Sequence, residues 1–146
     1  VADAIGKEKT GIRLSPYGVG NGLQLYPEID ATYKYLAEKL NSIGIAYIHL
    51  VDHSSMGAPA VSNELKKEIR KIFNNTLILS GGYDIERAEV DIKSGHGDLI
   101  AFGRPFISNP DLPERLLNSH PLVSPDMGTF YTPGSQGYTD YPVYKA

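Results

Sequence analysis

Short apolar runs alternate with amphipathic stretches along this chain. Each run has the length of a strand and is followed by polar, Gly or Pro residues and then by helical spacing; the runs are Ile12–Leu14, Ile45–Val51, Thr76–Leu79 and Asp98–Phe102. Their first residues lie roughly 20 to 35 positions apart, as in consecutive βα units joined by short loops. The pattern therefore predicts an α/β fold with four parallel strands.

The first two predicted helices each have one apolar face. Asp30 is expected to cap the first helix and Gly44 to end it. The apolar face of that helix holds Ile29, Tyr33, Leu36, Ala37, Leu40 and Ile43, and that of the second holds Leu65, Ile69, Ile72 and Phe73. The charged residues of the second helix are predicted to face largely outward as a solvated surface; they are Lys66, Lys67, Glu68, Arg70 and Lys71.

Two further helices and a coil are predicted in the second half of the chain. The third helix should start at Asp84, end near Gly95 and bury Ile85, Ala88 and Ile92. The fourth should have Asn109 as N-cap and Pro110 as its first residue. After Ser119 the sequence is rich in Pro, Gly and Tyr without a helical period, so we expect an ordered coil or short hairpin lying on the body.

Composition and charge narrow the possible functions. The 146 residues correspond to one domain, and 14 basic against 17 acidic residues leave no basic surface for nucleic acid or anionic lipid. The absence of cysteine excludes disulfides, thiolate metal sites and cysteine nucleophiles. No apolar run approaches a membrane span, and the amino-terminal residues lack the apolar core of a signal peptide. We therefore expect a cytoplasmic protein.

Repeated βα units occur in open doubly wound sheets and in closed eight-stranded barrels. The doubly wound sheet that binds a dinucleotide has a G-x-G-x-x-G loop after its first strand. The glycines at positions 18, 20 and 22 do not have that spacing, and no helix follows them at once. They match a dinucleotide loop poorly, and a flexible surface loop is the simpler interpretation.

Glycines follow the last two predicted strands directly. Gly81 and Gly82 follow the third strand, and Gly103 and Arg104 follow the fourth. Glycine loops let backbone N–H groups approach an anion closely, and an arginine adds a bidentate cation, so this pattern is typical of a phosphate site. Eight-stranded barrels bind phosphate with the loops after strands seven and eight. The alternative is that the glycines only make tight turns.

Along the first strand, Ile12 and Leu14 point to one face, and Arg13 and Ser15 point to the other. If that face lines the mouth of a barrel, the guanidinium is at least half-buried and needs an anionic or acceptor partner. The partner is either a ligand or a carboxylate of the chain itself.

Five blocks together closely resemble the old yellow enzyme family, whose members are FMN-dependent ene-reductases on a (β/α)8 TIM barrel. The blocks are GIRLSPYG (11–18), GIAYIHL (44–50), LILSGGYD (77–84), DLIAFGRPFISNPDLPERL (98–116) and FYTPGSQGYTDYP (130–142). They match only the second half of such a protein, so residues 1–119 would be βα units five to eight and residues 120–146 the carboxyl-terminal tail. A complete barrel takes about 250 residues or more.

The resemblance implies roles for single residues. Arg13 matches the arginine that contacts the pyrimidine side of the flavin, and Tyr131 matches the tail aromatic that lines the substrate cavity. Phe102 would support the flavin pocket, although a plain core role fits it equally. The positions that match the FMN-binding loops around the phosphate are Gly81, Gly82, Gly103 and Arg104.

The resemblance also implies the reaction. In the family, NADPH or NADH reduces FMN, and the flavin delivers hydride to the β-carbon of an activated alkene. The pair that binds the substrate carbonyl and the tyrosine that donates the proton precede Arg13 in the family, so no residue of this chain is assigned a catalytic role. No metal site is expected from the four histidines, His49, His53, His96 and His120.

A half-barrel leaves two strand edges unpaired and the apolar inner face open. We therefore expect it to self-associate or to pair with the missing amino-terminal half. The first hypothesis is the flavin-anchoring half of an ene-reductase. The alternatives are a non-catalytic FMN- or phosphate-binding half-barrel that self-associates, and a different phosphate-binding barrel enzyme.

Overall fold

The computed structural model describes residues 1–20 and 22–145. The chain forms two compact units, Val1–Ala101 and Phe102–Ala146. The first unit contains the whole sheet and the helices between its strands. The second unit contains two short helices and the Pro-, Gly- and Tyr-rich tail.

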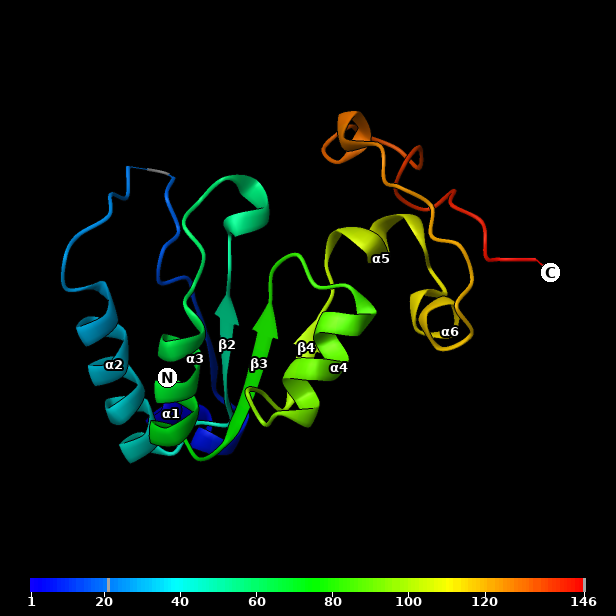
Figure 1. Ribbon diagram of the computed structural model, residues 1–146. Helices are drawn as coiled ribbons and strands as arrows, with labels where there is room; N and C mark the ends of the chain where they lie inside the picture. Colours follow the sequence, from blue (N-terminus) through cyan, green and yellow to red (C-terminus); the bar gives the residue numbers. More distant parts are fainter. Residues whose placement is uncertain (21, 146) are drawn as a thin grey trace. The chain divides into compact units, whose positions relative to one another are not determined.

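The first unit is built on a four-stranded parallel sheet (Figure 1). The strands are β1 (Gly11–Leu14), β2 (Tyr47–Val51), β3 (Thr76–Ser80) and β4 (Leu99–Ala101), and they neighbour one another in chain order. Arg13 pairs with His49, and His49 with Ile78. The prediction of four consecutive parallel βα strands is confirmed.

The chain begins with the short helix α1 (Ala2–Ile5) and a 3-10 turn, Lys7–Lys9. The helices that follow, α2 (Ile29–Ile43), α3 (Asn63–Ile72) and α4 (Ile85–Lys93), lie on one side of the sheet (Figure 1). The sheet side chains beneath them are almost fully buried, namely Ile48, Leu50, Leu77 and Leu79. Leu65, Ile69 and Phe73 of the α3 segment complete this core. Burial of these large apolar side chains is the main source of stability for this unit.

The ends of α2 agree only partly with the prediction. Gly44 ends the helix in the left-handed conformation, with φ of +77°, as expected for a C-cap glycine. The N-cap is Glu28, without a side-chain hydrogen bond, so the predicted capping role of Asp30 is wrong. Asp30 is the second residue of the helix, within its first turn, and its carboxylate accepts a hydrogen bond from the Tyr17 hydroxyl. Ile43, which the helical spacing places on the apolar face, is 48% exposed.

Helix α3 differs from its prediction at one charged position. Ser62 caps it by accepting a hydrogen bond from the Leu65 amide, and Leu65 and Ile69 are buried as predicted. Lys66, predicted among the outward charges, is only 4% exposed. Its ammonium group is directed to Asp52, a carboxylate that follows β2.

Helix α4 starts as predicted, because the Asp84 carboxylate accepts a hydrogen bond from the Arg87 amide. Ala88 is buried, but the predicted burial of Ile85 and Ile92 is wrong, because both are exposed. The buried polar position of this helix is Asp91. The inward face is therefore narrower and more polar than the apolar spacing indicated.

The second unit corrects the prediction for the fourth helix. Helix α5 (Arg104–Ser108) begins directly after Gly103, and α6 (Leu112–Leu117) begins after Asp111. Asn109 is the buried C-cap of α5 and not the N-cap of a helix. Its side-chain amide donates to the carbonyls of Pro105 and Val123, so it joins a helix to the tail.

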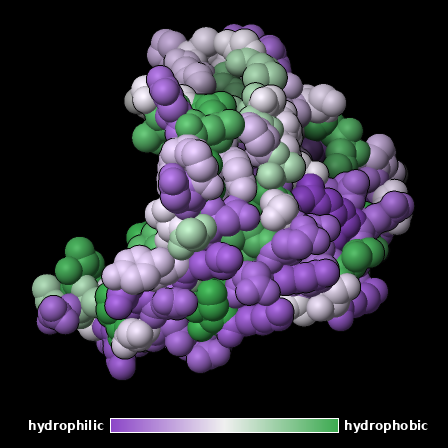
Figure 2. All heavy atoms as spheres, turned by 60° about the vertical axis from the view of Figure 1, so that its left-hand side comes forward, coloured by the Kyte–Doolittle hydropathy of each residue, from purple (hydrophilic) through white to green (hydrophobic). Residues whose placement is uncertain are grey.

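The tail has no hairpin within residues 120–145, and its regular part is a 3-10 turn, Met127–Thr129. This confirms the coil and not the hairpin of the prediction. No helix of the described chain is long and apolar enough to span a bilayer. Figure 2, with the α2 side turned forward, shows mostly hydrophilic side chains interrupted by small apolar groups.

Candidate functional site

The carboxyl ends of the parallel strands place three loops at one edge of the sheet, where α/β proteins bind ligands. His53, in the loop after β2, is bonded to Ser15 after β1 through Nε2 and Oγ at 3.2 Å. Asp52 lies beside the turn after β3, because its N–H donates to the Ser80 carbonyl at 2.9 Å. The loops after β1, β2 and β3 therefore form one connected surface in the first unit.

Arg13 lies near this edge on the sheet face opposite the helices. Its side chain is exposed, and within residues 1–20 and 22–145 it forms no ion pair. The alternative in which a carboxylate of the chain neutralises it is therefore not observed. Its neighbour across the strand pair is His49, whose ring lies 2.8 Å from the Ser80 hydroxyl. Burial and the charge of Arg13 both lower the pKa of His49, which favours a neutral ring beside the cation.

The turn after β3 needs its glycines for geometric reasons. Gly81 and Gly82 have φ of +119° and +61°, values that L-residues with a Cβ rarely adopt. A Cβ on Gly81 would collide with the Asp52 carbonyl. Among the described residues neither glycine N–H has an acceptor. The tight turn is thus observed, and its N–H groups are also free to bind an anion.

A cluster of partly buried charged residues contacts this turn, and the sequence analysis does not predict it. Asp52 Oδ2 lies 3.6 Å from Lys66 Nζ and 4.0 Å from Arg87 Nη2. Arg87 Nη1 donates to the Gly81 carbonyl at 3.1 Å, and its guanidinium lies 4.1 Å from the centre of the Tyr83 ring. The cluster therefore connects the loop after β2, helix α3 and the Gly81–Gly82 turn.

The second half of the cluster is centred on Asp91. Tyr83 donates its hydroxyl proton to Asp91 Oδ2 at 2.6 Å, and His96 Nδ1 lies 3.0 Å from Oδ1. Burial raises the pKa of Asp91, but these two hydrogen bonds and the charge of His96 outweigh it, so the net pKa is lowered. Burial and then the charge of Arg87 lower the pKa of Lys66. One member of the cluster could have been found from the sequence, because Asp52 is a carboxylate directly after a buried strand.

The second unit contains the other predicted flavin residues. Gly103 precedes α5, and the space that a Cβ on it would occupy is open. Arg104 is the first residue of α5 and is half-buried, as is Phe102 before it. Arg104 has no ion pair within the part of the chain that the structure describes. Tyr131 is 98% exposed and meets Phe130 edge to face.

The histidines have ordinary hydrogen-bonding or stacking partners. His49 is bonded to Ser80 and His53 to Ser15, His96 contacts Asp91, and His120 stacks on Tyr144. Within the described ranges no three His, Asp or Glu side chains are arranged to hold a metal ion.

Comparison with known proteins gives a consistent result. The model of the NADH:flavin oxidoreductase / NADH oxidase family matches residues 1–122. A putative 12-oxophytodienoate reductase 11 of Oryza sativa subsp. japonica is 40% identical over 97% of this chain and 39% of its own length. The 12-oxophytodienoate reductase 2 of Arabidopsis thaliana is 38% identical over 100% of this chain and 40% of its own length. The chain thus spans about two-fifths of these relatives.

Solved structures agree with the sequence matches. Morphinone reductase superposes with a TM-score of 0.91 at 40% identity, covering 98% of this chain and 38% of that one. The old yellow enzyme homologue from Zymomonas mobilis gives a TM-score of 0.90 at 36% identity, covering 98% of this chain and 41% of that one. With the parallel sheet, these likenesses confirm the predicted fold, which is part of a (β/α)8 barrel.

Proposed function

The chain belongs to the NADH:flavin oxidoreductase / NADH oxidase family, and from that premise we propose that it is the flavin-anchoring half of an FMN-dependent ene-reductase. Residues 1–119 are βα units five to eight in this proposal, and residues 120–146 are the tail. The observation that carries it is the family match over residues 1–122, together with Arg13 near the carboxyl end of β1, which forms no ion pair with residues 1–20 or 22–145. A cytoplasmic location is part of the same proposal.

The residues present fit FMN chemically. Arg13 offers a guanidinium without a carboxylate partner among the described residues, as the electron-rich pyrimidine edge of a flavin requires. In the described parts of the chain the N–H groups of Gly81 and Gly82 have no acceptor, and Gly103 leaves open space next to a helix start. These features suit a phosphate.

Each residue has a defined task in this proposal. Bound FMN supplies the hydride-transfer chemistry. Arg13 holds the pyrimidine edge and stabilises the negative charge that develops there on reduction. Gly81, Gly82, Gly103 and Arg104 contact the phosphate through N–H groups and the guanidinium. Phe102 packs beside the flavin, and Tyr131 lines the substrate cavity.

The substrate and the reductant are inferred from the family. We propose an activated alkene as substrate and NADPH or NADH as reductant, which the names of the reductases similar to this chain support. The residues that bind the substrate carbonyl and donate the proton are proposed to lie in the preceding units of the barrel. The chain alone is then expected to be inactive.

A second function is favoured by the open inner face of the sheet. Leu99 is 54% exposed and Tyr47 is also exposed on that face, and β1 and β4 each have one strand neighbour among the residues that the structure describes. Exposed apolar side chains beside free strand edges promote association. The alternative is therefore a non-catalytic FMN- or phosphate-binding half-barrel that self-associates.

The experiment is an FMN titration of the chain alone and of the complete barrel, by which we mean this chain together with the four preceding units. Intact mass and the flavin absorbance between about 350 and 500 nm report the bound species. We expect the complete barrel to bind FMN and reduce an enone. A complete barrel that binds no FMN would refute the proposal, and enone turnover by the chain alone would refute the non-catalytic alternative.

Replacing Arg104 tests the phosphate assignment. We expect Arg104→Ala in the complete barrel to weaken FMN binding by about 1.5–3 kcal/mol, because a charge-assisted contact is lost. Lys93→Ala is the control, because Lys93 is an exposed cation paired with Glu89 within α4. An unchanged FMN dissociation constant in Arg104→Ala would remove this residue from the site.

A further inference from the structure

One arginine holds the backbone of the turn that follows β3. Arg87, in the first turn of α4, donates a hydrogen bond from Nη1 to the Gly81 carbonyl at 3.1 Å. Its guanidinium lies over the Tyr83 ring, 4.1 Å from the ring centre, and its Nη2 lies 4.0 Å from Asp52 Oδ2. These contacts fix both the position and the plane of the guanidinium. All of them lie within the first unit.

The carboxylate beside this arginine is itself held in place. Asp52 Oδ1 accepts a hydrogen bond from the Ser54 N–H at 2.9 Å, and Oδ2 lies 3.6 Å from Lys66 Nζ. The Asp52 N–H in turn donates to the Ser80 carbonyl at 2.9 Å, directly before the turn. The frame from which Arg87 reaches the turn is therefore fixed.

The carbonyl that Arg87 holds belongs to the same peptide group as the Gly82 N–H. This peptide is trans, so its C=O and its N–H point in opposite directions. Because the carbonyl points to Arg87, the Gly82 N–H points away from it. Among the described residues that N–H has no acceptor, and Gly82 is exposed. The contact with Arg87 thus presents a free donor at the surface of the turn.

The two glycines make this peptide easy to turn over. Gly81 and Gly82 both have positive φ, and glycine adopts positive and negative φ about equally readily. A rotated peptide would replace the outward N–H by a carbonyl oxygen, which repels an anion. The tight turn requires glycines, so its orientation has to be set by a residue outside it.

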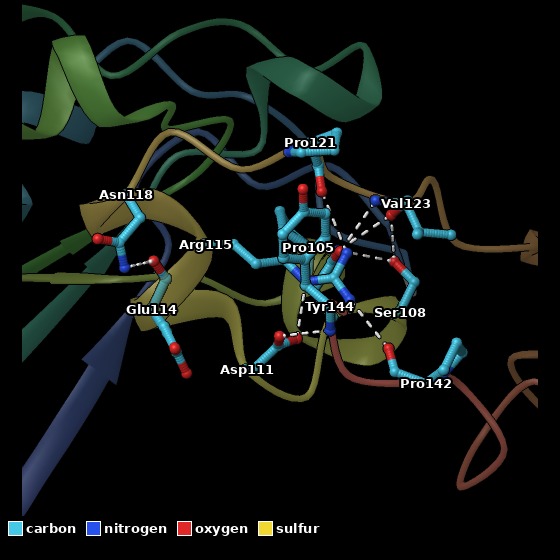
Figure 3. A network of polar contacts seen from close by, with 11 residues as sticks. Pro105, Ser108, Asp111, Glu114, Arg115, Asn118, Pro121, Val123, Pro142 and Tyr144 are labelled. Carbon is cyan, nitrogen blue, oxygen red and sulfur yellow. Dashed lines mark hydrogen bonds and ion pairs between the residues drawn. The ribbon is translucent and has the colours of Figure 1, made fainter. Parts of the chain in front are cut away.

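Arginine is used in a similar way in the second unit. Arg115 in α6 is 2% exposed, and it donates to Asp111 Oδ1 and to the carbonyls of Pro121 and Pro142 (Figure 3). The planar fork of donors holds a carboxylate and backbone carbonyls at the same time, which a lysine cannot do in this geometry. Arg115 thereby closes the tail, whereas Arg87 fixes a single peptide.

We propose that Arg87 is a positioning residue for the phosphate of FMN: by holding the Gly81 carbonyl it keeps the Gly82 N–H pointing outward, where the phosphate accepts it. The inference rests on the proposed function and adds to it the residue that orients one of the phosphate-binding peptides. A donor that is oriented in advance needs no reorganisation when the anion arrives. Arg87 acts through this peptide and does not contact FMN.

The test compares Arg87→Met with a control variant in the complete barrel. FMN and riboflavin are titrated separately, because riboflavin has the same ring and ribityl chain but no phosphate. The ratio of the two dissociation constants separates a loss at the phosphate from a general loosening of the flavin site. Crystal structures of the variants without flavin show the orientation of the Gly81–Gly82 peptide.

Arg70→Met is the matched control. Arg70 also pairs with a carboxylate, Asp98, and donates to a backbone carbonyl, that of Phe73. The N–H of that peptide, on Asn74, already donates to Asn41 Oδ1 at 3.0 Å. Phe73 precedes β3 and Asp98 precedes β4, so the control acts at the edge of the sheet opposite to the Gly81–Gly82 turn.

We expect the FMN dissociation constant to rise about tenfold in Arg87→Met, because apparent affinity falls with the fraction of molecules in the binding orientation. The riboflavin constant should not change, and the Gly81–Gly82 peptide should be rotated or present in both orientations. Arg70→Met should alter neither the ratio nor the peptide. Arg87→Lys keeps the charge but not the fork of donors. It should give an intermediate ratio, and it remains informative if Arg87→Met does not fold.

Three results would overturn the inference. Equal rises for FMN and riboflavin would show that Arg87 supports the whole site, and an unchanged FMN constant would show that the peptide needs no such support. An Arg87→Lys variant equal to the wild type would leave only the charge as the cause. If the wild-type barrel bound no FMN, the proposed function and the phosphate role would both fail, whereas the crystal structures would still decide whether Arg87 orients the peptide.

Discussion

Two cationic side chains of the first unit, Arg13 and Lys66, lie in opposite surroundings. Arg13 is a charged residue inside an apolar strand, and its side chain is exposed and forms no ion pair within the described residues. Lys66 looked like one of several solvated lysines, yet it is buried beside Asp52. Its burial depends on a partner in another loop, which helical spacing does not indicate.

Removing the Arg13 charge should make the flavin harder to reduce. In the complete barrel we expect Arg13→Ala to lower the two-electron potential by roughly 30–60 mV, since about 1.4 kcal/mol corresponds to 30 mV and the cation stabilises the reduced flavin. Dye-coupled reductive titration measures the shift. Lys71→Ala, at an exposed lysine paired with Glu68, should leave the potential unaltered, and an equal potential in both variants would argue against the assigned role.

Gly81 should tolerate a side chain far less well than another left-handed glycine. Gly81→Ala adds a collision with the Asp52 carbonyl to the conformational penalty, so we expect a loss of about 3 kcal/mol or more in the free energy of unfolding. At Gly95, φ is +68° and a Cβ would meet open space, so Gly95→Ala should cost only about 1–2 kcal/mol. Urea denaturation compares the two, and equal losses would refute the collision.

At the level of elements, the helices are joined by charge as well as by apolar packing. Helix α4 contributes Arg87 and Asp91, and α3 contributes Lys66, to the cluster behind the Gly81–Gly82 turn. Asp91 is buried and bonded to Tyr83 and His96. Because a buried charge without its partner is strongly unfavourable, these residues act together. The cluster thereby fixes the loops that the proposed FMN site uses.

The cluster predicts how stability depends on pH. The pKa of Asp91 is lowered in the folded state. Its ionised carboxylate therefore adds to the free energy of unfolding above the pKa of the unfolded chain, about 3.9, and this contribution is lost as the pH falls through the pKa of the folded state. Asp91→Asn should reduce stability at pH 7 by about 2–3 kcal/mol, because two hydrogen bonds to a charged group are weakened. The substitution should also make the free energy of unfolding fall less steeply between about pH 5 and 3.

Urea unfolding measured at several pH values tests this expectation. Asp3→Asn is the control, because Asp3 is an exposed carboxylate of α1 without an ion pair in the described parts of the chain. A pH profile of Asp91→Asn that runs parallel to that of the wild type would show that Asp91 does not contribute to the acid sensitivity.

At the scale of the whole molecule, the fold is part of a (β/α)8 barrel, and within the first unit the helices α2, α3 and α4 lie on one side of the sheet (Figure 1). Within the described residues of the first unit, no helix covers the face that carries Arg13, Tyr47 and Leu99. In a complete barrel that face is the packed interior. The isolated chain therefore exposes surface that is suited to association.

We expect the chain alone to associate in a concentration-dependent way through this face. Leu99→Lys should weaken association, because it places a charge on the exposed apolar face of an edge strand. Val90→Lys is the control, because Val90 is similarly exposed but lies on helix α4. Sedimentation velocity over a range of concentrations measures both. A monomeric wild-type chain, or equal effects of the two variants, would contradict the expectation.

The sequence by itself determined the order and type of the elements. Apolar runs and helical spacing give four parallel βα units, because alternation and 3.6-residue periodicity are properties of neighbouring residues. Gly44 and Asp84 were predicted correctly as helix ends for the same local reason. The motif blocks also identified the family before any geometry was known.

Only the tertiary structure decided which polar groups meet. The Asp52, Lys66 and Arg87 contacts, the buried Asn109 and the Arg115 closure of the tail join residues that are distant in the sequence. Such contacts depend on how helices and loops are placed around the sheet, and rotation of a helix about its axis changes which side chains face inward. Local pattern therefore determined the barrel units, whereas long-range packing decided how the loops that would hold the cofactor and the substrate are fixed.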